Sequence, residues 1–214
     1  MFIARLIENP SVYAPLALIV IFSICAHELM HAWTALKQGD DTAARLGHLT
    51  LNPLKQMGVM SLVMFAFVGV AWGCVPVDPA RMRRRWSPAL VAAAGPLTNL
   101  GLFVVFAFLT VVCLHFPAHF KNEMAGAILL AGATMNLVLF VLNLLPIPGL
   151  DGFVILRWFF PRLTFGGSEF AKGAYLVLVV LIFALFSYVF DAAQYLTCRF
   201  VELTCRFADL IFGA

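Results

Sequence analysis

Residues 12–33 read VYAPLALIVIFSICAHELMHAW, an apolar run with three ionisable side chains near its end. A helix of about 20 residues spans the ~30 Å hydrocarbon core of a bilayer, so this run is long enough to cross a membrane. An ionisable residue inside such a span opposes insertion by about 3 kcal/mol, and such residues persist where they have a partner or a function. The run therefore predicts a membrane helix that also carries chemistry.

Four further apolar blocks follow, at roughly 58–75, 87–114, 125–145 and 171–195. Of the 214 residues, 63% are hydrophobic and 12% charged, whereas about 25% of a soluble domain is charged. This composition excludes a soluble enzyme and predicts an all-α polytopic membrane protein with about four to six transmembrane helices in a lipid bilayer. The net charge of +3 is too small to indicate a nucleic-acid partner.

Basic residues are concentrated beside the first two apolar blocks. They are Lys37, Arg45 and Lys55 after the first block and Arg81, Arg83, Arg84 and Arg85 after the second, whereas the segment between the third and fourth blocks has Lys121. Such clusters mark the cytoplasmic side of a cell (inner) membrane. Block 58–75 is then re-entrant, with four full spans and an outside amino terminus; the alternative is an ordinary span of 18 residues.

The first block contains His27-Glu28-Leu29-Met30-His31, an HExxH pattern. Residues four apart share a helical face, so His27 and His31 can direct their imidazoles at one ion, and Glu28 can reach a water beside it. This ligand set suits one zinc ion per chain, with Glu28 as the general base of peptide hydrolysis. The alternative is a polar network between helices.

A catalytic zinc ion needs a third protein ligand. Block four ends in NLLPIPGLDG, residues 143–152, where two prolines break the helix just before Asp151. Asp151 is the best carboxylate available, ahead of Asp40, Asp41, Asp78 and Asp191, and its alternative role is that of a turn or helix-capping residue. A shared ion requires Asp151 and the two histidines at one depth, which favours the re-entrant interpretation of 58–75.

Two asparagines lie inside or at the end of apolar blocks, Asn99 in GPLTN and Asn143 before the prolines. Either amide can stabilise an oxyanion or hold an extended substrate backbone. Interhelical hydrogen bonding is an equally good interpretation for both. Asn136, seven residues before Asn143 on the same helical face, is interpreted as a packing residue.

The C-terminal end carries a near repeat, LTCRFVE at 196–202 and LTCRFAD at 203–209. Its apolar residues form one helical stripe, namely Leu196, Phe200, Leu203, Phe207 and Leu210. We expect an amphipathic helix over 196–214 that lies on the membrane or packs on the rest of the protein. Residues 1–195 are expected to form a single membrane domain with its catalytic core at about 12–160. Association of two copies (a homo-oligomer) through this helix is a minority interpretation.

Together, HELMH at 27–31, GPLTN at 95–99 and NLLPIPGLDG at 143–152 resemble the site-2 protease family of intramembrane zinc metalloproteases. The segments LGHLTLNPLK at 46–55 and VPVDP at 75–79 are also similar to members of this family. The resemblance covers about 27–152 and implies that the zinc ligands are His27, His31 and Asp151, with Glu28 as the base. It also implies a β element within 46–55 that pairs with an unwound transmembrane protein substrate. No segment looks like a PDZ domain.

Three residues depart from the family pattern. Met30 and Phe153 stand where members often have glycine, and Asp78 stands where asparagine is usual. None of the three replaces a ligand or the base, so the departures bear on substrate preference.

The leading hypothesis is cleavage of a substrate's transmembrane segment on the cytoplasmic side, with a role in regulated signalling implied by the resemblance. A second class is a membrane metal-binding or transport protein with the same ligands and no hydrolysis. A third is a membrane scaffold with an accidental HExxH pattern. Glu28 distinguishes the first two, because a metal-binding site without hydrolysis needs no base beside the ion.

Overall fold

The computed structural model describes residue 4 and residues 7–115, 123–161 and 169–212. All regular elements in these ranges are helices, which confirms the predicted all-α class. Three are long and apolar enough to cross a membrane: α2 (Pro10–Gln38), α6 (Ser87–His115) and α7 (Glu123–Asn143). The chain is therefore a polytopic membrane protein, and these three helices are the spans found within the described residues.

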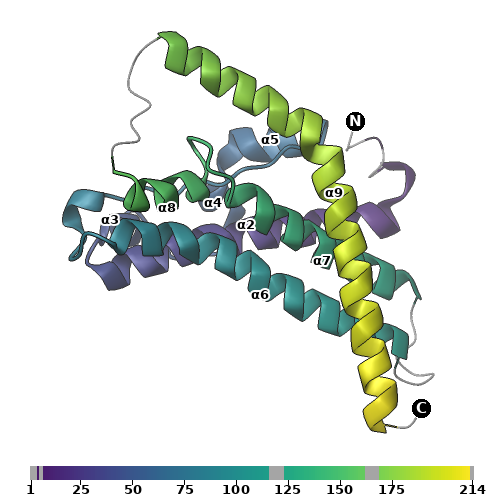
Figure 1. Ribbon diagram of the computed structural model, residues 1–214. Coiled ribbons are helices and arrows are strands. Elements are labelled where there is room, and N and C mark those ends of the chain that lie inside the picture. The colour runs from purple at the N-terminus through teal and green to yellow at the C-terminus, as the bar shows by residue number, and fades with distance from the viewer. Residues whose placement is uncertain (1–3, 5–6, 116–122, 162–168, 213–214) are drawn as a thin grey trace.

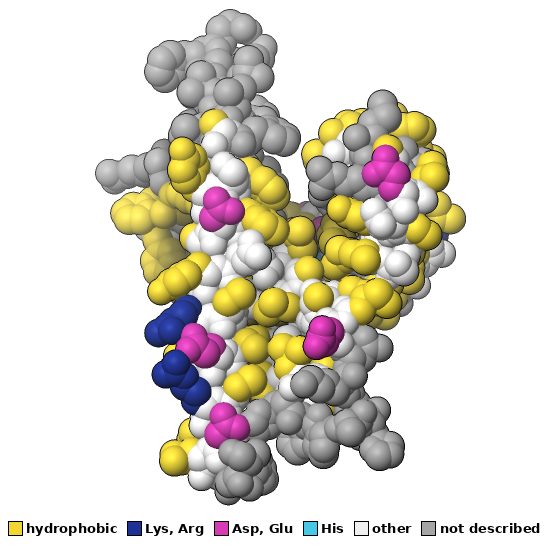
Figure 2. Space-filling model, turned by 90° about the vertical axis from the view of Figure 1, so that its right-hand side faces the viewer, with side chains coloured by type: hydrophobic (Ala, Val, Ile, Leu, Met, Phe, Trp, Pro, Cys, Tyr) yellow, Lys and Arg dark blue, Asp and Glu magenta, His cyan; other side chains and the backbone are white. Residues whose placement is uncertain are grey.

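Helix α6 packs against both α2 and α7, and these two helices also contact each other (Figure 1). The largest apolar cluster among the described residues lies where α6, α7 and α9 meet. It contains Phe103, Ala107 and Val111 from α6, Ala133 from α7 and Val201 from α9. Many large apolar side chains point outward instead, among them Leu18, Val105 and Phe108, which are 52–68% exposed. On the face in Figure 2, hydrophobic side chains cover much of the described surface, with acidic and basic side chains among them.

The second apolar block forms a short helix and an extended return. Helix α5 (Gly58–Val68) has 11 residues, a length of roughly 16 Å that is too short to cross the hydrocarbon core. The alternative of an ordinary 18-residue helical span is therefore wrong. After α5 the chain runs back without regular structure: Trp72 N–H donates to Ser61 Oγ at 2.9 Å, and Cys74 N–H donates to the Gln56 carbonyl at 2.9 Å.

The segment 46–55 contains no strand, although the resemblance implied a β element there. It is a loop that leads from α3 (Thr42–Arg45) into α4 (Pro53–Gln56). Asn52 caps α4 by accepting a hydrogen bond from Leu54 N–H at 2.9 Å. The buried Gln56 amide donates to the His48 and Thr50 carbonyls. Those two carbonyls accept from a side chain within this loop and take part in no strand pairing.

Asp40 joins the end of α2 to the segment before α6. Its side chain is fully buried and accepts hydrogen bonds from Thr42 N–H at 3.0 Å and Asp78 N–H at 2.6 Å. Burial raises the pKa of this carboxyl, but the hydrogen bonds lower it by more, so the net shift is downward. The short helix η1 (Pro79–Arg81) follows directly, so Asp40 fixes the segment that precedes it against α2.

Two helices follow α7, namely α8 (Asp151–Phe159) and α9 (Glu169–Phe212). Helix α9 is continuous through residues 195 and 196, where sequence analysis placed a boundary. Its later half crosses α6 and α7 (Figure 1) and buries Ala193, Thr197 and Val201 against the body. Most of the predicted apolar stripe is exposed, with Leu203 56% and Leu210 82% accessible, but the ring of Phe200 lies 5.4 Å from that of Phe103 in α6. Side chains of 169–183, which include most of the fifth apolar block, lie outside the described residues.

Candidate active site

Helix α2 presents His27, Glu28 and His31 on its buried side near its C-terminal end. The three residues are 6%, 8% and 8% exposed, in a span whose other buried residues are mostly small. The two imidazoles meet at an interplanar angle of 83°, with their Nε2 atoms 2.9 Å apart. The four-residue spacing therefore brings both rings to one point, as expected from helix geometry.

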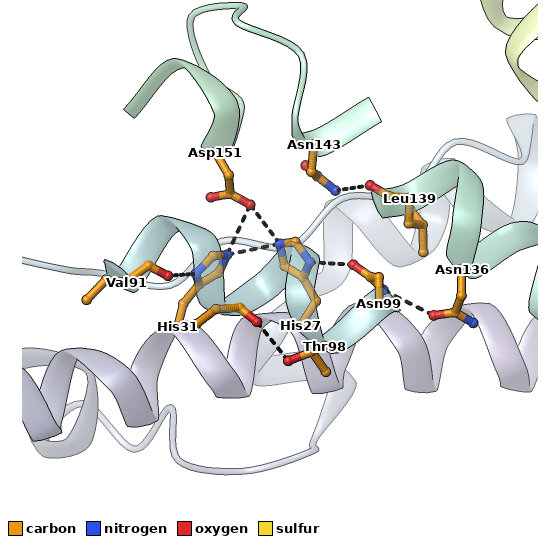
Figure 3. A network of polar contacts seen from close by, with 10 residues as sticks. His27, His31, Val91, Thr98, Asn99, Asn136, Leu139, Asn143 and Asp151 are labelled. Carbon is orange, nitrogen blue, oxygen red and sulfur yellow. Dashed lines mark hydrogen bonds and ion pairs between the residues drawn. The ribbon is translucent and has the colours of Figure 1, made fainter. Parts of the chain in front are cut away.

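Asp151 approaches the same point from a different helix, α8. Helix α7 ends at Asn143, the prolines keep the chain out of a helix, and α8 begins at Asp151. Its Oδ2 lies 3.1 Å from Nε2 of His27 and 3.3 Å from Nε2 of His31 (Figure 3). Although Asp151 stands in the first turn of a helix, its carboxylate faces the histidines.

The second nitrogen of each histidine has its own partner. Nδ1 of His31 lies 2.7 Å from the Val91 carbonyl, and Nδ1 of His27 lies 2.6 Å from Oδ1 of Asn99. A carbonyl oxygen only accepts, so each Nδ1 must carry the proton and donate it. In a neutral imidazole the other nitrogen is then a bare lone pair. Two lone pairs and a carboxylate oxygen therefore converge without a proton between them.

This arrangement fits a metal ion. Within the described part of the chain, His27, His31 and Asp151 form the group of potential ligands, with ligand atoms all within 4.8 Å of one another. Oδ2 of Asp151 is buried without a hydrogen-bond donor. Ligands at 2.0–2.1 Å in a tetrahedron stand roughly 3.3 Å apart, close to the distances from Oδ2 to the two Nε2 atoms. A Cβ on Gly95 would overlap both Nε2 atoms, so this glycine keeps the space open.

Glu28 borders a cavity of about 500 Å³ that also contains the three potential ligands. The segment 71–75, which has no regular structure, forms one wall of the cavity, and Gly73 lies directly over the Glu28 side chain. A Cβ at Gly73 would overlap the Glu28 carboxylate. The cavity thus places a carboxylate, a potential metal site and an irregular backbone segment around one space.

The two asparagines that the sequence singled out lie in different surroundings. Asn99 is fully buried; its Oδ1 accepts from His27 and its Nδ2 donates to Asn136 at 3.1 Å. This placement favours the interhelical hydrogen-bonding alternative for Asn99. Asn143 lines the cavity, and its Nδ2 donates to the Leu139 carbonyl at 3.0 Å (Figure 3). An amide has two N–H groups, so Asn143 retains one for a substrate.

The other candidate carboxylates belong to other parts of the structure. Asp40 is the buried residue that joins α2 to the segment before η1, and Asp41 pairs with Arg45 and Arg81 at the surface. Sequence reasoning did not identify the roles of Gly73, Gly95 and the Val91 carbonyl. Gly95 opens the GPLTN motif, but its close approach to the histidines depends on how α6 packs against α2.

Comparisons with known proteins agree with this geometry. The sequence model of "Peptidase family M50" matches residues 15–126. "Putative zinc metalloprotease YwhC" of Bacillus subtilis is 35% identical over 189 residues, which cover 83% of this chain and 83% of that protein. "Putative zinc metalloprotease Rip2" of Mycolicibacterium smegmatis is 37% identical over 139 residues, 62% of this chain and 52% of that protein.

An archaeal relative is more distant. "Putative zinc metalloprotease MJ0611" of Methanocaldococcus jannaschii is 32% identical over 133 residues, 62% of this chain and 63% of that protein. The chain thus spans less than two thirds of the mycobacterial and archaeal proteins. No solved structure gives a significant match.

Proposed function

The chain belongs to peptidase family M50, and we propose that it is an intramembrane zinc metalloprotease. In this proposal it hydrolyses a peptide bond in or near a transmembrane segment of a membrane-protein substrate. The observation that carries the proposal is the convergence of His27 Nε2, His31 Nε2 and Asp151 Oδ2 beside Glu28. These three atoms would hold the zinc ion. Two nitrogens and one oxygen leave a fourth position open, as catalytic zinc sites do.

When held by these three residues, zinc would supply polarisation of the scissile carbonyl and a water molecule acidic enough to attack near neutral pH. Glu28 takes the proton of the attacking water as the new C–O bond forms. It then delivers this proton to the amine nitrogen as the C–N bond breaks. Burial of Glu28 against segment 71–75 keeps its carboxylate in one orientation for both transfers.

The substrate enters this cavity in an extended form, because a regular helix hides its peptide bonds within its own hydrogen bonds. The cavity is lined largely by apolar residues, and its wall 71–75 has no regular structure of its own. Asn143, with one N–H engaged at Leu139, directs its amide toward the cavity and holds the substrate backbone or the developing oxyanion. Substrates with helix-weakening glycine or proline near the cleaved bond are therefore preferred.

The site opens toward the cytoplasm in this proposal. The metal-binding end of α2 leads into Lys37, and the segment before α6 carries Arg83, Arg84 and Arg85. Basic residues gather on the cytoplasmic side of membrane proteins. His27 and His31 lie in the same half of α2 as Lys37, and Arg83 N–H donates to the Gln38 carbonyl at the end of this helix at 2.8 Å. Cleavage therefore releases the cytoplasmic part of the substrate.

The test uses full-length protein, purified in detergent and reconstituted with zinc into vesicles. Model substrates carry one transmembrane helix, with or without a Gly-Pro pair, and products are identified by mass spectrometry. We expect cleavage within or beside the helix by the wild type and none by Glu28→Gln that retains its zinc. A zinc-loaded wild type that leaves every substrate intact would favour the metal-binding or transport alternative.

A further inference from the structure

A continuous line of buried side-chain hydrogen bonds leads away from the metal site. Asn99 Oδ1 accepts from His27, and Asn99 Nδ2 donates to Asn136 Oδ1 at 3.1 Å (Figure 3). Asn136 Nδ2 in turn donates to Ser23 Oγ and to the Gly132 carbonyl, each at 2.9 Å. Ser23, Asn99 and Asn136 have no exposed surface. The line joins α2, α6 and α7, and water does not reach its middle members.

The direction of every bond in this line is set at its far end. The Gly132 carbonyl can only accept, so the Asn136 amide must turn its nitrogen toward it. Oδ1 of Asn136 then faces Asn99, so Asn99 must donate to it through Nδ2. Oδ1 of Asn99 is thereby turned toward His27, and Nδ1 of His27 must be the protonated nitrogen.

We propose that Asn136 is a positioning residue for the metal site: it fixes the orientation of the Asn99 amide, which fixes the tautomer of His27 and leaves Nε2 free to bind the ion. This inference rests on the zinc site proposed above. If Asn99 turned its nitrogen toward His27 instead, Nδ1 would become the acceptor. The proton would then sit on Nε2 and point at the ion, and His27 would lose its lone pair there.

The two histidines differ in this respect. Nδ1 of His31 donates to the Val91 carbonyl, a main-chain group whose polarity cannot reverse. Nδ1 of His27 donates to an amide that presents either oxygen or nitrogen after a half turn. The tautomer of His27 therefore depends on which way the Asn99 amide is turned, whereas that of His31 has no such dependence. Asn136, on a third helix, fixes the orientation of the Asn99 amide.

The test measures zinc affinity by competition with a chelator in detergent-purified protein. Asn136→Leu keeps the approximate volume but removes the bond to Asn99, so we expect zinc to bind roughly 10–100-fold more weakly, as on loss of an outer-shell partner. Asn136→Asp still accepts from Asn99 and should stay within a few-fold of wild type. Thr134→Val is the matched control: Thr134 is buried on the same helix and bonds only to the Leu130 carbonyl among the partners found.

A second background separates orientation from general packing. In Asn99→Asp the side chain presents an oxygen to His27 in either orientation. The orientation that Asn136 imposes on residue 99 therefore no longer affects the tautomer of His27. We expect Asn136→Leu to change zinc affinity less than about threefold when it is combined with Asn99→Asp, well below the outer-shell effect. An equal loss in both backgrounds, or no loss in either, would overturn the proposal. A folded wild type that binds no zinc would overturn both the metal site and the positioning role of Asn136. That result is distinct from a wild type that binds zinc while the Asn136 variants show no effect.

Discussion

Asp151 Oδ2 lies 3.1 Å from Nε2 of His27, although the two residues come from opposite ends of the catalytic core. Oδ2 is buried and has no hydrogen-bond donor, and Nε2 has no proton to give when Nδ1 donates to Asn99. Two unshared electron pairs at this distance repel unless a cation lies between them. The pair is therefore arranged for an ion rather than for a hydrogen bond.

Replacement of Asp151 by asparagine should weaken zinc binding by more than the ~10–100-fold typical of outer-shell changes, because it removes the charged ligand itself. Chelator competition on the folded protein measures this. Asp191→Asn, an exposed carboxylate on α9, is the control and should bind zinc as the wild type does. Equal zinc affinities for the Asp151→Asn and wild-type proteins would remove Asp151 from the site.

Glu28→Gln should retain zinc and lose peptide hydrolysis by roughly 10²–10⁴-fold, the usual contribution of a general base. Glutamine has nearly the same shape beneath Gly73, so the cavity wall should stay in place. Metal content and the vesicle cleavage assay are measured on the same preparation. Residual cleavage at the wild-type rate would show that another group takes the proton.

Gly95→Ala should lower zinc affinity, because the added methyl group would overlap Nε2 of both histidines. Gly101→Ala is a matched control in the same helix, since nothing lies within 4 Å of the position that its Cβ would occupy. The control should bind zinc normally and gain up to ~1 kcal/mol of helix stability. If both variants bind zinc as tightly as the wild type, the close approach of α6 to the site is wrong.

Asp40→Asn should destabilise the fold by about 1–3 kcal/mol at neutral pH, because a buried charge-assisted acceptor is lost. The folded-state pKa of Asp40 lies below its unfolded value, so its contribution is present above the unfolded pKa of about 3.9. It is lost as pH falls from there through the folded-state pKa. Thermal unfolding of both proteins from pH 7 to pH 3 should show their difference shrinking at the acidic end.

Asp41→Asn is the control for this pH dependence, because Asp41 pairs with Arg45 and Arg81 at the surface, where ion pairs contribute little. A difference between wild type and Asp40→Asn that stays constant down to pH 3 would contradict the assigned role of the buried carboxylate.

The local patterns of the site were readable from sequence. HExxH spacing fixes the relation of His27 to His31 within one helix, and the proline-rich approach to Asp151 indicates a break at which a carboxylate is presented. The partners of Asn136 were not readable, since a polar residue on an apolar helix can pair with any helix that packs beside it. Its choice of Asn99 depends on the way α6 and α7 cross.

Helix α9 shows a second limit of periodicity. The repeat in 196–209 gives a strong apolar stripe, yet α9 packs through Ala193, Thr197 and Val201. In a membrane protein, large apolar residues gain nothing by leaving lipid, whereas small residues allow two helices to approach closely. Most of the stripe is therefore exposed here, with Phe200 as the member that contacts α6, and the buried positions beside it hold smaller residues.

X-ray absorption at the zinc edge on detergent-purified wild-type protein tests directly whether His27, His31 and Asp151 hold the ion. We expect one zinc ion per chain with two imidazole nitrogens and oxygen ligands, all at about 2.0–2.1 Å. A sulfur shell near 2.3 Å would place the ion at one of the cysteines. That result, or a folded protein without specifically bound zinc, would contradict a site formed by His27, His31 and Asp151.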